Sequence, residues 1–164
     1  LKKPHIQMTF EETKPENAQA AREHIQQAEE ICGRAPLTTI PQVEPIGPRR
    51  LLDALIIAPC TGNTLAKLSH GITDTAVTMA AKAHLRSDRP LLIALASNDA
   101  MSANLRNIGT LLSRKSVYFT PMVQDDPTAK PHSLVADFGM VPAALEAALE
   151  GRQLRPVFLE KRGE

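Results

Sequence analysis

The stretch DALIIAPCTGNT (53–64) decides the fold, because an aliphatic run ends abruptly at Pro59 and gives way to a small polar loop. The residues that follow, TLAKLSHG (64–71), have the composition of a helix. In an open α/β sheet, ligands bind beyond the carboxyl ends of the strands, where backbone N–H groups and a helix N-terminus face anions. We therefore expect residues 61–64 to lie at a binding crevice.

Strand-like segments alternate with helix-like segments along the rest of the chain. The strand-like segments are HIQMTF (5–10), ALIIA (54–58), LLIALA (91–96), SVYFT (116–120) and RPVFLE (155–160). Continuous apolar runs such as LLIALA are typical of central strands covered by helices on both faces. Helical composition marks residues 15–32, which Gly33 should end, and AALEAALEG (143–151), which should end at Gly151.

This alternation predicts a single α/β domain over residues 1–164, with a three-layer, doubly wound parallel sheet and right-handed crossovers. Four prolines between residues 35 and 50 predict a connector with little regular structure. The chain opens on LKK directly before a strand and without Met, so we expect the first strand of the fold and its loop to be missing from this sequence.

Composition excludes several classes of protein. The chain of 164 residues has a net charge of +1 with acidic and basic residues interspersed, which argues against binding to nucleic acid. The apolar runs are too short to span a bilayer, and no signal peptide opens the chain, so we expect no membrane association and a cytoplasmic location. Cys32 and Cys60 form no disulfide framework and no metal-ligand spacing, so no metal site is predicted.

Four motifs in order carry a family resemblance. They are VEPIGP (43–48), DALIIAPCTGNTLAKLSHGITDTAVTMAAKAHLR (53–86), SNDAMSANLRNIGTLL (97–112) and QDDPTAKPHSLVAD (124–137). Together they resemble the B-subunit family of bacterial dipicolinate synthases, a branch of the wider flavoprotein family that includes FMN-containing cysteine decarboxylases.

The resemblance implies a flavodoxin-like fold, FMN as cofactor, and a homo-oligomer acting in the mother cell of a sporulating bacterium. It also implies oxidation of a dihydrodipicolinate-type precursor to the aromatic dicarboxylate, together with an A subunit that uses NAD(P). Two alternatives stay open: an independent FMN-dependent decarboxylase or prenyl-flavin-type enzyme, and a non-catalytic partner that stabilises the A subunit. The chain has no GxGxxG fingerprint, so a mononucleotide is better supported than a dinucleotide.

Candidate cofactor contacts come from the switch-point rule together with the resemblance. They are Pro59, Cys60, Thr61, Gly62, Asn63, Thr64, Asp74, Ser97, Asn98 and Asp99. Several of them have a structural alternative as helix caps. Asn63 or Thr64 would cap a helix starting at Leu65, Asp74 would cap the next helix, and Asn98 or Asp99 would cap one starting near Ala100.

Two further segments have competing interpretations. Cys60 beside a helix N-terminus has the setting of a nucleophile, but a small buried side chain is the favoured interpretation. The segment QDDPTAKPHS (124–133) contains adjacent carboxylates but too few oxygens for a hard cation, so a turn is expected, with Lys130 and His132 in a possible cover over the pocket.

A dicarboxylate substrate would need fixed cations or N–H donors. The candidates are Lys67, Lys82, Arg86 and Lys130. Lys82 and Arg86 share a helical face, for which a solvated surface is the alternative. Small residues over 76–83 suggest a helix surface that meets another subunit. No catalytic residue is identifiable from the sequence.

Overall fold

The computed structural model describes residues 15–160, with side chains from residue 22 onward. The strand predicted over 5–10 lies outside the described residues. Three parallel strands form the centre of the sheet: β1 (Leu55–Cys60), β2 (Leu91–Ser97) and β3 (Val117–Phe119). Residues 91–95 are fully buried, as the continuous apolar run predicted for a central strand.

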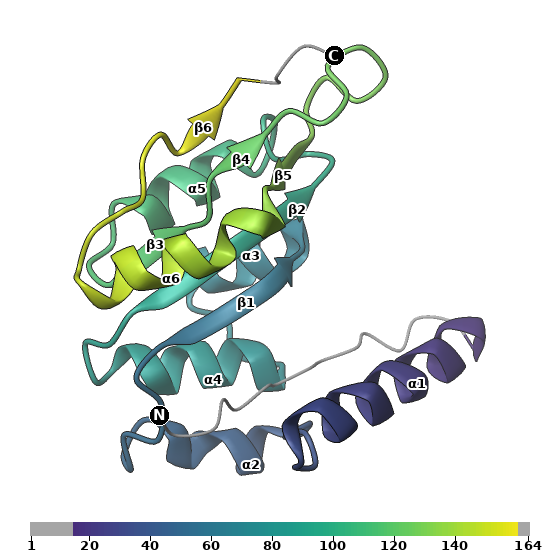
Figure 1. Cartoon of the computed structure of the whole chain (residues 1–164), viewed down its shortest axis with the longest axis vertical. Coiled ribbons are helices and arrows are strands. Elements are labelled where there is room, and N and C mark those ends of the chain that lie inside the picture. The colour runs from purple at the N-terminus through teal and green to yellow at the C-terminus, as the bar shows by residue number, and fades with distance from the viewer. Residues whose placement is uncertain (1–14, 161–164) are drawn as a thin grey trace.

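Helices cover both faces of the sheet (Figure 1). The helix α6 (Val141–Leu149) lies in front of the sheet in that view and contacts β2 and β3. Behind it lie α3 (Gly62–His70) and α5 (Leu105–Leu112), which contact each other. The predicted α/β layering is therefore confirmed, and α6 ends as expected, before Gly151 at a positive φ of 76°.

The sheet has the predicted parallel centre and also contains an antiparallel strand that the sequence did not predict. The strand β5 (Leu134–Ala136) runs antiparallel to both β2 and β4 (Met122–Val123). Its pairing uses Ala96 and Ser97, at the carboxyl end of β2, whereas β3 pairs with the amino-terminal half of β2. Within residues 15–160, the strand β6 (Phe158–Leu159) pairs only with β4, which agrees with the predicted edge strand.

The amino-terminal part contains more helix than predicted. The helix α1 (Pro15–Cys32) and its end at Gly33 (φ 64°) are confirmed. The connector holds α2 (Ile40–Val43) and the short 3₁₀ helix η1 (Glu44–Ile46), so the expectation of little regular structure there was wrong. Two of its four prolines, Pro41 and Pro45, stand in the first turns of these helices, where a missing N–H costs nothing.

The helix α4 (Ala76–Leu85) packs against α2 and η1 within the same chain. Gly47 approaches Ala83 so closely that a Cβ on Gly47 would lie 2.1 Å from the Ala83 carbonyl oxygen. Ala80 and Ala81 are 1% and 0% exposed. The small residues over 76–83 thus serve close packing inside the chain, so taking them as an interface with another protomer was wrong.

The remaining regular element of the described part is η2 (Phe138–Met140), where Asp137 accepts a hydrogen bond from the backbone N–H of Gly139. Over residues 15–160, no helix combines the length and the apolar character that crossing a membrane requires.

Candidate functional site

Two polar loops meet at the carboxyl edge of the sheet. One follows β1 and begins at Thr61, and the other follows β2 from Ser97. Because β1 and β2 are parallel neighbours, both loops leave the sheet at the same edge. A Cβ on Gly62 would lie 2.6 Å from the Ser97 Oγ and 2.8 Å from an Asp99 carboxylate oxygen. The predicted adjacency of the two loops is therefore present in the structure.

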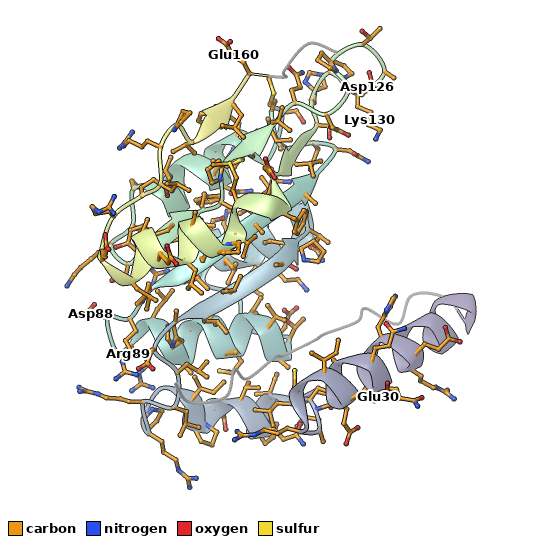
Figure 2. The ribbon with its side chains drawn as sticks, in the orientation of Figure 1. Glu30, Asp88, Arg89, Asp126, Lys130 and Glu160 are labelled. Atoms are coloured by element: carbon orange, nitrogen blue, oxygen red, sulfur yellow. The ribbon has the colours of Figure 1, made fainter. Side chains whose placement is uncertain are left out.

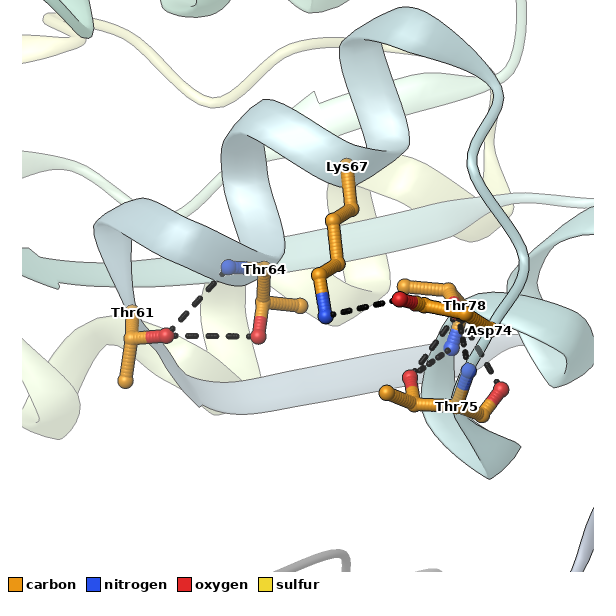
Figure 3. A network of polar contacts seen from close by, with 6 residues as sticks. All are labelled: Thr61, Thr64, Lys67, Asp74, Thr75 and Thr78. Atoms are coloured by element: carbon orange, nitrogen blue, oxygen red, sulfur yellow. Dashed lines mark hydrogen bonds and ion pairs between the residues drawn. The ribbon is translucent and has the colours of Figure 1, made fainter. Parts of the chain in front are cut away.

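The first loop ends in a capped helix. The Thr61 hydroxyl accepts a hydrogen bond from the backbone N–H of Thr64 at 3.3 Å and lies 3.2 Å from the Thr64 hydroxyl (Figure 3). The helix α3 begins at Gly62, not at Leu65, so the proposed caps Asn63 and Thr64 were wrong. The reason is that Thr61 already has the extended backbone and the side-chain oxygen that a cap requires.

The capped end of α3 presents a group of donors to the edge of the sheet. The first N–H groups of a helix, together with its dipole, favour an anion. The side chains of Thr61 and Asn63 are exposed beside these N–H groups, and Gly62 has no side chain to cover its own backbone. This end of α3 has the chemistry to hold a phosphate or another anion.

The second loop is organised around Asp99. Its carboxylate accepts hydrogen bonds from the Ser97 hydroxyl at 2.5 Å and from the Asn104 amide at 2.9 Å. These hydrogen bonds hold the pKa of Asp99 below its ordinary value, and the one from Ser97 has the largest effect. The carboxylate of Asp99 is thus ionised at neutral pH and favours hydroxyl or N–H donors over a second anion.

A chain of buried amides continues from this carboxylate to α3. The Asn107 amide donates to the side-chain oxygen of Asn104 at 2.8 Å, and the Ser69 hydroxyl donates to the side-chain oxygen of Asn107 at 2.8 Å. Asn104 and Asn107 are buried. Because Ser69, Asn104 and Asn107 are hydrogen-bonded to one another in this way, the network fixes the second loop relative to α3.

The sequence did not predict Asn104, Asn107 and Ser69 as members of this network. A signal was present, since the two asparagines stand three apart within the quoted motif and therefore share a helix face. The helix itself begins at Leu105, not near Ala100. Asp99 is not its cap, because its carboxylate and carbonyl hold a preceding turn instead.

Asp74 lies outside this pair of loops. Figure 3 shows its carboxylate facing the Lys67 ammonium of α3, at 3.2 Å. The cap of α4 is Thr75, whose hydroxyl accepts from the Thr78 N–H, so the assignment of Asp74 as that cap was wrong. The ion pair links the end of α3 to the start of α4.

Cys60 is a buried side chain without nucleophilic character. It is fully buried at the end of β1, and burial raises its pKa to about 12. Its Sγ contacts the Thr61 carbonyl at 3.7 Å. The thiol is therefore protonated at neutral pH, as expected for the structural interpretation.

The segment 124–133 forms an ordered loop beside the second polar loop. The Met101 N–H donates to the His132 carbonyl at 2.9 Å, which joins the two loops. Within the segment, the Lys130 ammonium pairs with Asp125 at 3.2 Å. Lys130 thus lies in a loop attached to the candidate site.

The other candidate cations lie elsewhere. Figure 2 shows Asp88 and Arg89 at the end of the molecule opposite Asp126 and Lys130. Arg86 precedes this distant turn, and Lys82 lines a cavity that reaches Leu91, the first residue of β2. The structure therefore does not bring Lys82 or Arg86 to the two polar loops. Among the described residues, no group of three or more His, Cys, Asp or Glu side chains is arranged to hold a metal ion.

Comparison with known proteins identifies relatives along most of the chain. The model of the family named Flavoprotein matches residues 6–143. The B subunit of dipicolinate synthase from Bacillus subtilis (strain 168) is 41% identical over 138 residues, which cover 84% of this chain and 69% of that protein.

Solved structures agree with this comparison. The B subunit of dipicolinate synthase from Bacillus halodurans C superimposes with a TM-score of 0.83 at 38% identity, covering 96% of this chain and 79% of that one. The FMN-dependent cysteine decarboxylase SpaF gives a TM-score of 0.61 at 24% identity, over 90% and 78% of the two chains, and shares the fold. The predicted flavodoxin-like fold and family resemblance are confirmed.

Proposed function

Since this chain belongs to the Flavoprotein family, we propose that it binds FMN and acts as the B subunit of a dipicolinate synthase. The observation that carries the proposal is the contact between the two polar loops at Gly62, in a chain 41% identical to such a subunit. The location proposed for it is the cytoplasm of the mother cell in a sporulating bacterium.

FMN consists of a phosphate, a polyhydroxylated linker and a flavin ring, and the two loops have complementary chemistry. The phosphate suits the α3 N-terminus, with the Thr61 hydroxyl and the Asn63 amide beside it. The ionised Asp99 would repel a phosphate, but it suits a hydroxyl or a ring N–H as donor. We therefore place the phosphate on the Thr61 side and the uncharged part of the cofactor toward Asp99. When bound, FMN supplies redox chemistry.

Three residues have supporting roles in this proposal: Pro59, Cys60 and Thr64. Pro59 belongs to the end of β1, directly before the loop. Thr64 bonds the Thr61 hydroxyl, and the buried Cys60 packs beneath the loop. Asn98 is exposed beside Asp99 and contributes its amide to the same edge. Asp74 acts indirectly, because its carboxylate is engaged with Lys67.

The substrate proposed is a dihydrodipicolinate-type dicarboxylate. Of the four candidate cations, Lys130 is the best placed to meet a carboxylate, since its loop is joined to the second polar loop by the Met101–His132 hydrogen bond. Lys130 would exchange its exposed pairing with Asp125 for one with the substrate. The A subunit would bring NAD(P), and self-association of this chain is part of the proposal.

Two measurements on the full-length protein test this proposal. The visible absorption spectrum after purification and after addition of FMN reports flavin binding, and dipicolinate formation by the mixed A and B subunits reports the reaction. We expect a flavin band in the spectrum of this protein. We expect dipicolinate only when both subunits are present. A protein that binds no FMN but is needed for product would be a stabilising partner. Product formed at the full rate without this chain would refute the assignment.

A further inference from the structure

The cavity lined by Lys82 lies at the opposite end of β2 from the two polar loops. It has a volume of about 180 Å³ and is enclosed by the last turns of α3 and α5, by α4, and by the first residue of β2. The strand β2 runs from Leu91 at this cavity to Ser97 at the candidate FMN site. Seven residues of extended strand separate the two places by roughly 20 Å.

The inner wall of the cavity is apolar. Leucine side chains from four different elements form it: Leu68, Leu85, Leu91 and Leu111. The end of α3 is also on this side, and two of its last carbonyl groups are hydrogen-bonded. The N–H of Ile72 bonds the Lys67 carbonyl at 2.9 Å, and the N–H of Gly71 bonds the Leu68 carbonyl at 3.3 Å. The wall therefore offers a mainly apolar surface, and these two carbonyl groups are not left unpaired beside it.

Two cations stand on the outer side of the same cavity. Lys82 comes from α4 and Arg114 follows α5. Neither side chain has an ion pair or hydrogen bond with any residue in the described part of the chain, whereas Lys67, Lys115 and Lys130 are each paired with an aspartate. A cavity with leucine walls and two unpaired cations at its rim is complementary to a ligand that is apolar at one end and anionic at the other.

We propose that this cavity binds a small ring-bearing carboxylate, with the ring against the leucines and the carboxylate between Lys82 and Arg114. The volume agrees with the ring, because an apolar cavity of roughly 150 Å³ in another protein holds benzene. The guanidinium of Arg114 binds a carboxylate through two parallel N–H groups, and the ammonium of Lys82 adds a second charge. This site is separate from the one proposed for FMN and does not depend on it.

Titration calorimetry of the full-length protein with benzoate tests the proposal. Benzyl alcohol has a similar ring without the charge, and inorganic phosphate has charge without the ring. We expect benzoate to bind at one site per chain, and each of the other two to bind at least about 10-fold more weakly, because each lacks one half of the recognition. Equal binding of phosphate would show a plain anion patch and overturn the proposal, and so would absence of benzoate binding.

Variants locate the site. Lys82→Met and Arg114→Met should each weaken benzoate binding about 10-fold, since each removes one charge-assisted contact. Both side chains are exposed, so the fold should be unaffected. The matched control is Lys115→Met, which removes a neighbouring exposed cation that is paired with Asp88 outside the cavity. Loss of affinity in the control, or full affinity in both test variants, would refute the site.

Saturating FMN separates this proposal from the proposed function. Benzoate affinity should stay the same with and without FMN, because the two places lie at opposite ends of β2. Competition between FMN and benzoate would mean that benzoate occupies the two polar loops, and the proposed second site would be rejected. A protein that binds benzoate as expected but binds no FMN would contradict the flavin proposal alone.

Discussion

Gly62 and Ser97 touch across the carboxyl edge of the sheet, and no side chain fits between them. A Cβ on Gly62 would meet the Ser97 Oγ at 2.6 Å and the Asn104 amide nitrogen at 2.7 Å, both well inside ordinary contact distance. Ser97 and Asn104 cannot move aside cheaply, because both are buried and hydrogen-bonded to Asp99. The absence of a side chain at Gly62 therefore sets the distance between the two loops.

Gly62→Ala should destabilise the protein by about 1–3 kcal/mol, as overpacking of a tight contact does, and weaken FMN binding by moving the loops apart. Gly109→Ala is the matched control, since Gly109 lies inside α5 with nothing within 4 Å of a new Cβ. That variant should gain about 0.5–1 kcal/mol from helix propensity. Urea unfolding measures both changes, and a stable Gly62→Ala protein with unaltered FMN affinity would contradict the contact.

Thr61→Ala should affect both stability and FMN affinity. It removes the cap of α3, which costs about 1 kcal/mol, and also removes a hydroxyl from the candidate phosphate site. Thr75→Ala removes an equivalent cap from α4, where the same N–H bond measures 3.2 Å, but it lies outside the two loops. Calorimetry with FMN should therefore show weaker binding only for Thr61→Ala. If both variants lose FMN affinity equally, the effect comes from stability and not from a contact.

The two cysteines should react very differently with a thiol reagent. Cys60 is buried with its pKa raised to about 12, whereas Cys32 is partly exposed. In the folded protein at about pH 8, one thiol per chain should react quickly, and the second only after denaturant is added. Cys32→Ser should abolish the fast phase. Rapid labelling of Cys60 in that variant would disprove its burial.

Stability should decrease in mild acid through His84. Burial lowers its pKa from the ordinary value of 6.5, and its Nε2 lies 3.0 Å from the Pro90 carbonyl. The folded state favours the neutral ring, so its stabilising effect is complete above pH 6.5 and is lost as pH falls through the lower pKa of the folded state.

Unfolding free energies measured from about pH 7.5 to about pH 5 check this, with a slope of up to about 1.4 kcal/mol per pH unit for one proton. His84→Gln keeps a hydrogen-bond donor and should reduce the slope. His132→Gln, at an exposed side chain, should leave it unchanged. An unaltered slope in His84→Gln would assign the acid effect to other groups.

Lys130→Met should raise the Michaelis constant of the reconstituted A and B subunits for the dicarboxylate about 10-fold or more, if this ammonium binds a carboxylate. Lys115→Met is the control, because it also removes an exposed, aspartate-paired lysine, at the other end of the molecule. Identical kinetics of Lys130→Met and wild type would remove Lys130 from the substrate site.

The elements that the sequence predicted correctly are those with a local cause. The apolar run at 91–96 has to be buried on both faces, and Gly33 and Gly151 can adopt the positive φ that ends a helix. The adjacency of the loops at 61–64 and 97–99 followed from parallel pairing of their strands.

Other features depended on contacts between distant residues. The strands β4 and β5 are two and three residues long, too short for a periodic pattern, and they form because β5 pairs with the end of β2. Predictions of where helices begin were wrong where several neighbouring polar residues could serve as the N-cap. Thr61 caps α3 in place of Asn63, Thr75 caps α4 in place of Asp74, and Asp99 holds a turn. The burial of Ala80 inside the chain was not visible in the sequence, because small residues suit an internal contact and an interface between protomers equally.

Because β4 and β5 pair with each other, residues 124–133 form the closed end of a hairpin, and this bears on the speed and entropy of binding. The loop is also held internally, since the Gln124 amide donates to the Pro131 carbonyl at 2.8 Å. A ligand that touches Lys130 meets a surface that is already in place and loses little chain entropy on arrival. Association with this edge of the sheet should then be limited by encounter and orientation, and not by a slow rearrangement of the chain.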